Sequence, residues 1–146
     1  MIKTWICTKT LEKPYFFSFK SNAQNSWNLK QQKEGISIFA KDVFCDVNQG
    51  FDRDLILFKI VNSNNNDIKV SFKLNRWVDN VCLNCNSNSP EDYRYYNIQA
   101  SQTIEGDCDN FRSTNLSLFV KFHDINYSNT PRVLTNYSIE NIQIVD

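Results

Sequence analysis

The feature that most constrains this sequence is a strict alternation of apolar and polar residues between positions 68 and 75. Apolar side chains take every second position and polar ones the positions between, as Ile68, Val70, Phe72 and Leu74 against Lys69, Ser71, Lys73 and Asn75. Successive side chains of a β-strand point to opposite faces, so this period of two predicts a strand with one buried and one exposed face. Such a half-buried strand is typical of antiparallel sheets.

The same period recurs along the chain. Leu116, Leu118, Val120 and Phe122 alternate with mostly polar residues, although Phe119 falls on the outer face. Weaker alternation predicts strands over residues 36–44, 55–61, 93–99 and 133–145, the last as two strands or one long bent strand. The Asn- and Ser-rich run from Asn62 to Asp67 predicts a hairpin turn. Six to eight strands joined by turns predict an all-β fold, an antiparallel immunoglobulin-like β-sandwich.

Composition agrees with many strands and tight turns. Aromatic residues make up 14% of the chain, and it has twenty Asn but three Gly, so Asn would occupy the left-handed turn positions. Residues 25–34 are the one segment with helical potential, and a helix there would be short and superficial because it lacks an apolar stripe. The formal charge is zero and no apolar run is long enough for a transmembrane segment, which argues against binding of nucleic acid or membranes.

At 146 residues a single core is expected, and we assign the sandwich domain to residues 36–146. Residues 1–35 form an N-terminal segment that is either a degraded signal peptide or an extra strand. The apolar run Tyr15–Phe19 precedes small residues as in a signal peptide, but charged residues interrupt it. The first interpretation predicts the periplasm or the cell surface, and the second the cytoplasm.

The cysteines allow several chemistries. Cys82 and Cys85 form a C-x-x-C motif, which can supply two corners of a zinc tetrahedron that Cys45 and Cys108 would complete. In an exported protein the same four residues would instead form disulfides, in any of three connectivities. Free thiols are a third alternative, and the role of Cys7 stays open. A thioredoxin-like redox pair would need a helix N-terminus that the pattern does not predict.

A calcium loop is a weaker hypothesis. Oxygen ligands alternate after the predicted strand over residues 36–44, at Asp46, Asn48, Asp52 and Asp54. Phe51 stands where an EF-hand needs glycine and Leu57 where it needs glutamate, so a polar turn explains the pattern equally well. The acidic turn around Cys108, with Glu105, Asp107 and Asp109, allows the same two interpretations.

Two further groups of residues bear on function. Trp77, Tyr93 and Tyr95 would form a platform for a sugar or peptide if they are exposed on one face, and would belong to the core if buried; Trp27 and Tyr96 pose the same question. The one histidine, His123, follows a predicted strand, and the three glycines are too scattered for a phosphate loop. We therefore expect no enzyme and no obligatory cofactor.

The chain also resembles small uncharacterised proteins of flavobacteria and other Bacteroidota over residues 43–146. The resemblance rests on Ile68–Trp77, the C-x-x-C of Cys82 and Cys85, the Gly106-Asp107-Cys108 triplet and Leu134–Ile142. It implies an exported cysteine-bearing domain of unknown function. Together with the residues, it favours a non-enzymatic envelope or secreted module that binds a protein partner or serves as a subunit of an assembly. The alternative is a domain that binds a small ligand or carbohydrate through exposed aromatic residues.

Overall fold

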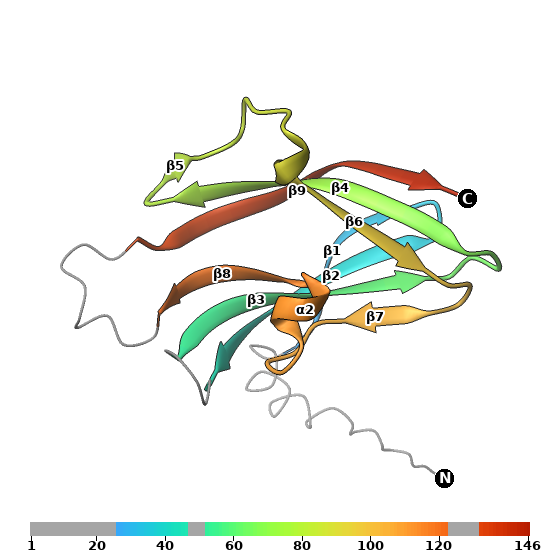
Figure 1. The fold of residues 1–146 in the computed structure, drawn as a ribbon, viewed down its shortest axis with the longest axis horizontal. Helices are drawn as coiled ribbons and strands as arrows, with labels where there is room; N and C mark the ends of the chain where they lie inside the picture. The colour runs from blue at the N-terminus through green and yellow to red at the C-terminus, as the bar shows by residue number, and fades with distance from the viewer. Residues whose placement is uncertain (1–25, 47–51, 123–131) are drawn as a thin grey trace, which may run out of the picture.

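The computed structural model describes residues 26–46, 52–122 and 132–146, and in this part of the chain two antiparallel sheets pack face to face (Figure 1). The predicted all-β, antiparallel, two-layered sandwich is confirmed. The described residues contain nine strands where six to eight were predicted, because two of them span only two or three residues. Helical structure in the same residues is confined to single turns, such as α2 (Phe111–Thr114).

The first sheet, sheet A, is built around the long strand β3. One edge of β3 pairs with β2, which pairs in turn with β1. The other edge of β3 is shared by two short partners, β7 and β8. The strands of sheet A are β1 (Asn28–Lys33), β2 (Ile36–Cys45), β3 (Arg53–Asn62), β7 (Thr103–Glu105) and β8 (Ser117–Phe122).

The second sheet, sheet B, is built in the same way around β4. Strand β9 runs along one edge, and β5 and β6 share the other. The strands are β4 (Ile68–Val78), β5 (Val81–Cys82), β6 (Tyr93–Ile98) and β9 (Leu134–Val145). The segment predicted as two strands or one bent strand is therefore one strand, with a register shift where Asn141 adopts a left-handed conformation (φ 55°).

The core lies between the sheets and is formed by the alternating apolar residues. The four apolar positions of β4 are at most 3% exposed, and Leu116 and Leu118 are 2% and 5% exposed. From sheet A they meet Ile36, Ile38, Phe58 and Ile60. Removal of this apolar surface from water is the main stabilising contribution to such a fold.

The helical potential noted for residues 25–34 is not realised in the described part of this segment, because residues 28–33 form β1 and a tight hairpin with β2. Lys33 pairs with Ile36 across a two-residue turn in which Glu34 and Gly35 both have positive φ (47° and 82°). Such turns match the twist of the flanking strands. All six side chains of β1 are exposed, which is why no apolar pattern marked it as an edge strand.

The hairpin predicted for Asn62–Asp67 is also wrong, since this turn leads from β3 in sheet A to β4 in sheet B. Asn62, only 1% exposed, holds the turn between β3 and β4 in place through its side chain. Its Nδ2 donates to the carbonyls of Asn66, Ile98 and Gln99, at 3.1, 3.3 and 3.0 Å, and its Oδ1 accepts from the Asn64 amide. These bonds tie the two sheets together at what we call the closed end.

Side chains also connect the sheets along both flanks. On one flank, Gln31 and Lys33 of β1 donate to the carbonyls of Ile139 and Ile142 in β9. On the other, Arg94 and Tyr96 of β6 both donate to the carbonyl of Asn115, each at 2.6 Å. At the end opposite Asn62 the sheets diverge (Figure 1), and we call this the open end.

Candidate functional site

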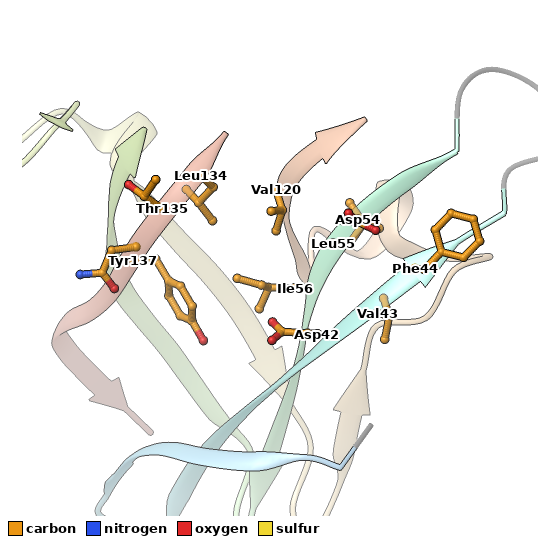
Figure 2. A pocket seen from close by; sticks show the side chains of 11 residues that line it. Asp42, Val43, Phe44, Asp54, Leu55, Ile56, Val120, Leu134, Thr135 and Tyr137 are labelled. Carbon is orange, nitrogen blue, oxygen red and sulfur yellow. The ribbon is translucent and has the colours of Figure 1, made fainter. Parts of the chain in front are cut away.

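A cleft of about 680 Å³ lies between the diverging sheets at the open end (Figure 2). It is formed by the ends of β2, β3 and β8 on one side and by the start of β9 on the other. Its lining residues are Asp42, Val43, Phe44, Asp54, Leu55, Ile56, Val120, Leu134, Thr135, Asn136 and Tyr137. Its size is that of an ordinary ligand site, and its wall combines apolar and polar surface in similar proportion.

The cleft forms where the inward-facing positions of β2 change character. Ile36, Ile38 and Ala40 are buried, but the next two inward positions are Asp42, which is exposed, and Phe44, which is 48% exposed. Enclosing an aspartate at a core position without a partner would cost roughly several kcal/mol. This residue therefore keeps the end of the sandwich accessible to water.

Tyr137 of β9 lies across the cleft from Asp42 (Figure 2). Burial raises the pKa of Tyr137 to about 12, and the carboxylate of Asp42 adds to the shift because a phenolate would face a second negative charge. The hydroxyl, protonated at neutral pH as in any tyrosine, resists ionisation even more strongly here and can donate a hydrogen bond. Asp54, at the rim, lies 3.9 Å from Lys121 Nζ.

The three residues proposed as an aromatic platform lie on the outer face of sheet B, where Tyr95 is exposed and Trp77 and Tyr93 are half-buried. Tyr93 and Tyr95 pair with Lys73 and Ser71, so they share the outward face of β4 with Trp77. The two tyrosine rings stack at 6.4 Å between centroids, and Tyr95 is 64% exposed. The other two aromatic candidates lie elsewhere, Tyr96 in the core and Trp27 beside Lys41 and Lys59 of sheet A.

A shallow hollow of about 270 Å³ adjoins Tyr95 on this outer face. The side chains that face it from three neighbouring strands are Lys69, Ser71, Tyr95, Asn97, Gln143 and Val145, so both polar groups and apolar surface line it. This combination of a ring and hydrogen-bonding groups suits a polar ligand that offers both a flat face and hydroxyl groups.

The four cysteines proposed as one set are divided between the two sheets. Cys45 pairs with Cys108 on the outside of sheet A (Cα–Cα 5.4 Å), and Cys82 pairs with Cys85 beside sheet B (Cα–Cα 5.8 Å). Of the alternatives, the structure therefore has two disulfides. In the described residues no cluster of three or more His, Cys, Asp or Glu is arranged to hold a metal. Cys7 and His123 lie outside the described residues.

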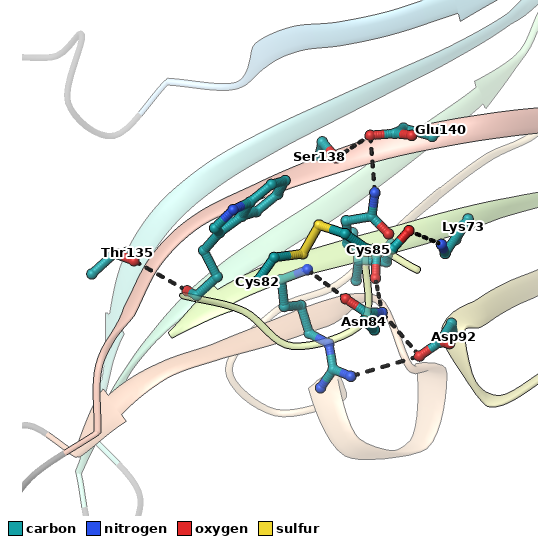
Figure 3. Close-up of a disulfide and its surroundings, with 12 residues drawn as sticks. Lys73, Cys82, Asn84, Cys85, Asp92, Thr135, Ser138 and Glu140 are labelled. Carbon is teal, nitrogen blue, oxygen red and sulfur yellow. Dashed lines mark hydrogen bonds and ion pairs between the residues drawn. A yellow bond between two sulfur atoms is a disulfide. The ribbon is translucent and has the colours of Figure 1, made fainter. Parts of the chain in front are cut away.

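The loop after β5 contacts β4 in a way that the sequence did not predict. The edge of β4 has no partner strand at residues 74–76, between β6 and β5, and the Asn84 side chain fills this gap (Figure 3). Its Nδ2 donates to the Leu74 carbonyl (2.9 Å) and its Oδ1 accepts from the Arg76 amide (3.0 Å), as a strand residue would do. The same Nδ2 also donates to Asp92.

This loop also buries residues that the alternation placed in solvent. Lys73 and Asn75 on the outer face of β4 are each only 4% exposed, so the prediction of a fully exposed face is wrong there. Lys73 Nζ donates to the Cys85 carbonyl at 3.2 Å, and Asn75 donates to Glu140 at 2.9 Å. A loop that returns over a strand has no local signature, and the C-x-x-C motif was the only signal near it.

The candidate calcium ligands are only partly described. Asp46 and Asp52 lie close together, and a hydrogen bond to Asp52, followed by the repulsion of its charge, raises the pKa of Asp46. Asp54 contacts Lys121 instead, and Asn48 lies outside the described residues. In the second acidic turn, the Asp107 carboxylate accepts from the amides of Asp109 and Asn110, so it serves the turn itself.

No helix in the described parts of the chain is long and apolar enough to cross a membrane. In comparisons with known proteins, no family model matches the chain and no curated protein matches it. A search of solved structures finds a likeness to the crystal structure of a DUF1425 family member from Shewanella, with 10% sequence identity and a TM-score of 0.36. The alignment covers 82% of this chain and 89% of that chain.

Proposed function

We propose that this domain is a non-enzymatic binding module of the periplasm or cell surface, and that a partner protein binds at its open end. The two disulfides support an oxidising compartment, because such bonds persist there and are rare in the cytosol. The cleft supports binding because it interrupts a core that side chains close at the opposite end and along both flanks.

The observation that carries the proposal is the succession Ala40, Asp42, Phe44 along the inner face of β2. It presents a carboxylate and a partly exposed ring opposite the Tyr137 hydroxyl. The complementary partner is a protein segment that inserts an apolar side chain next to a basic one. Buried apolar anchors supply most of the affinity in such contacts, and the charge pair supplies orientation.

Site-specific photocrosslinking in the native host tests this proposal. A photoreactive residue at Phe44 should yield one discrete crosslinked protein, while the same residue at the exposed Ala100 of the closed end should not. Asp42→Asn should weaken the binding of that protein and reduce its dependence on salt. Equal products from both positions, or none at Phe44 with the protein recovered alone, would contradict the proposal.

A second candidate function is carbohydrate binding on the outer face of sheet B. It is favoured by the exposure of Tyr95, its stacking on Tyr93 and the hollow beside it, which hydrogen-bonding side chains share with Val145. Calorimetry with a panel of neutral oligosaccharides tests it. Tyr95→Ala should abolish any binding, whereas Phe44→Ala at the open end should leave it unchanged; no heat with any member of the panel would argue against this function.

A further inference from the structure

Lys73 lies under the loop that carries the Cys82–Cys85 disulfide. Lys73 is 4% exposed, and its ammonium group donates to the Cys85 carbonyl at 3.2 Å and lies near enough to the Asp92 carboxylate to lower its pKa. Glu140, which pairs with Lys73 across the β4–β9 ladder, accepts hydrogen bonds from Asn75 and Ser138 at 2.9 and 2.7 Å (Figure 3). The charge of Lys73 is thus held directly against the residue that carries one of the two sulfur atoms.

The two disulfides differ in their access to solvent. Cys45 is 0% exposed and packs with Leu55, Leu57 and Phe111. Cys85 is an exposed residue in the turn after β5, and Cys82 is half-buried at the end of the two-residue strand. A thiol in solution can therefore approach the second disulfide but not the Cys45 side of the first, and access is a main determinant of exchange rates.

The loop does not depend on this disulfide for its position. Asn84, which lies between the two cysteines, is bonded to Leu74, Arg76 and Asp92, and the Leu83 amide donates to the Arg76 carbonyl at 2.9 Å. Opening of the sulfur–sulfur bond would leave these contacts in place. The folded domain can therefore exist with this pair either oxidised or reduced.

We propose that Cys82–Cys85 is a thiol–disulfide exchange site that a dithiol reduces while Cys45–Cys108 stays oxidised, with Lys73 as a positioning residue. A thiolate of the dithiol attacks the Cys82 sulfur, which forms a mixed disulfide and releases Cys85, the residue whose carbonyl Lys73 binds, as a thiolate. The second thiolate of the dithiol then attacks its own sulfur in the mixed disulfide and releases Cys82. The dithiol becomes a cyclic disulfide, two electrons pass to the protein, and both protein thiolates take up protons according to the pH.

The role of Lys73 follows from the chemistry of the leaving group. A nearby cation favours the thiolate form of a cysteine, and a thiol that ionises more readily also leaves faster in exchange. Thioredoxin-like proteins obtain this effect from a helix N-terminus. In this domain the positive charge comes instead from Lys73, a buried side chain of β4.

Stepwise reduction of the full chain in a Cys7→Ser background tests the selectivity. The folded protein is titrated with dithiothreitol, quenched with N-ethylmaleimide and mapped by peptide mass. We expect a species labelled at Cys82 and Cys85 only, before any label reaches Cys45 or Cys108. Simultaneous reduction of both disulfides, or earlier labelling of Cys108, would overturn the proposal.

Three variants test the role of Lys73. Lys73→Met should slow reduction about fivefold, Lys73→Arg should restore most of the rate, and Lys69→Met, on the exposed part of the same strand face, should change nothing. Equal rates in the wild type and Lys73→Met would remove Lys73 from the proposal.

A further measurement does not depend on the folding of the lysine variants. In a Cys7→Ser, Cys82→Ser protein, ultraviolet absorbance follows ionisation of the Cys85 thiol as the pH rises. We expect its midpoint well below the ordinary thiol value of about 8.5. A midpoint at or above that value would overturn the assignment of Cys85 as the leaving group.

Discussion

The two disulfide-bearing loops, residues 106–116 and residues 83–92, each close a gap beside a central strand. The first does so with main-chain hydrogen bonds and the second with a side chain. The central strand of each sheet has an edge shared by two short strands, and a gap lies between them. In sheet A the gap is at Phe58, whose amide donates to the Leu116 carbonyl and whose carbonyl accepts from the Gly106 amide, both at 2.9 Å. In sheet B it is at residues 74–76, and the Asn84 side chain fills it.

What holds each loop down also differs. The loop of sheet A, residues 106–116, packs its own Phe111 against Cys45, Leu55 and Leu57, so β3 is buried on both faces. The loop of sheet B covers Lys73 and is held by hydrogen bonds and by the contact between Arg76 and Asp92. Apolar burial is non-directional and large, whereas net hydrogen-bond contributions are about 1 kcal/mol each. We therefore expect the loop of sheet A to stay in place in the folded domain and the loop of sheet B to open more readily.

The largest expected effect is the loss of the first disulfide. Cys45 and Cys108 are 63 residues apart, so their bond restricts the unfolded chain strongly. Replacement of both by alanine should lower the free energy of unfolding by about 4 kcal/mol. Urea denaturation measures this loss of unfolding free energy, with the Cys82→Ala, Cys85→Ala protein as the matched control. A loss no greater than in that control would break the comparison.

Gly106→Ala tests the two main-chain hydrogen bonds at Phe58, which we call the main-chain bridge of sheet A. A Cβ atom at this position would collide with the backbone carbonyl of Leu116, which cannot move without disrupting its bond to Phe58. Gly106→Ala should therefore cost about 3 kcal/mol. Thermal unfolding measures it, and an unchanged melting temperature would show that the bridge is not tight.

Asn84→Ala tests the hydrogen bonds of the Asn84 side chain to Leu74 and Arg76, which we call the side-chain bridge of sheet B. It leaves the Leu74 carbonyl and the Arg76 amide without this partner at a partly buried edge. We expect a loss of about 2 kcal/mol in unfolding free energy, from denaturant curves. The exposed Asn86 two residues along is the control, and Asn86→Ala should be within about 0.5 kcal/mol of the wild type.

The second disulfide should contribute less than either bridge. Cys82 and Cys85 are only three residues apart, so the unfolded chain gains little freedom when the bond is lost. Replacement of both by alanine should cost about 1–2 kcal/mol. Hydrogen exchange should show faster opening confined to residues 81–92, and opening that spreads through β3 would contradict the distinction between the loops.

The smallest effect is a pH dependence confined to the loop of sheet B. Hydrogen bonds from Ser87 and Asn84, then the positive charges of Arg76 and Lys73, lower the pKa of Asp92. The folded state therefore favours the carboxylate, and this stabilisation is present above the unfolded value of about 3.8 and is lost as the pH falls below it. The stability difference between the wild type and Asp92→Asn should shrink between about pH 5 and pH 3, and a constant difference would contradict the assignment.

Prediction from the sequence succeeded where one residue and its immediate neighbours decide the outcome. The alternation around Val70 and Leu118 identified both inward faces because a period of two has only one structural meaning when half the positions are apolar. It failed at Asn62, because a turn between paired strands and a turn between sheets use the same residue types. It failed at β1, because an edge strand exposed along its whole length has no apolar side to reveal it.

The candidate sites were predicted less completely than the fold. Trp77, Tyr93 and Tyr95 share a face as the platform hypothesis required, since parity along neighbouring strands follows from the pattern. The cleft at Asp42 and Tyr137 was not predicted, because these residues come from different sheets and nearly a hundred positions lie between them in the chain. The cysteine pairing also stayed open, because four cysteines allow three connectivities.

The amino-acid sequence by itself determined that this chain forms paired strands, which residues face the core, and where most strands lie, because alternation is local and repeated. Only the tertiary structure decided which strands share a sheet, that each sheet carries one disulfide, with Cys45 buried and Cys85 exposed, and that Lys73 lies under the loop of the second. These outcomes depend on contacts between distant segments, which form only when both sheets close on a common core.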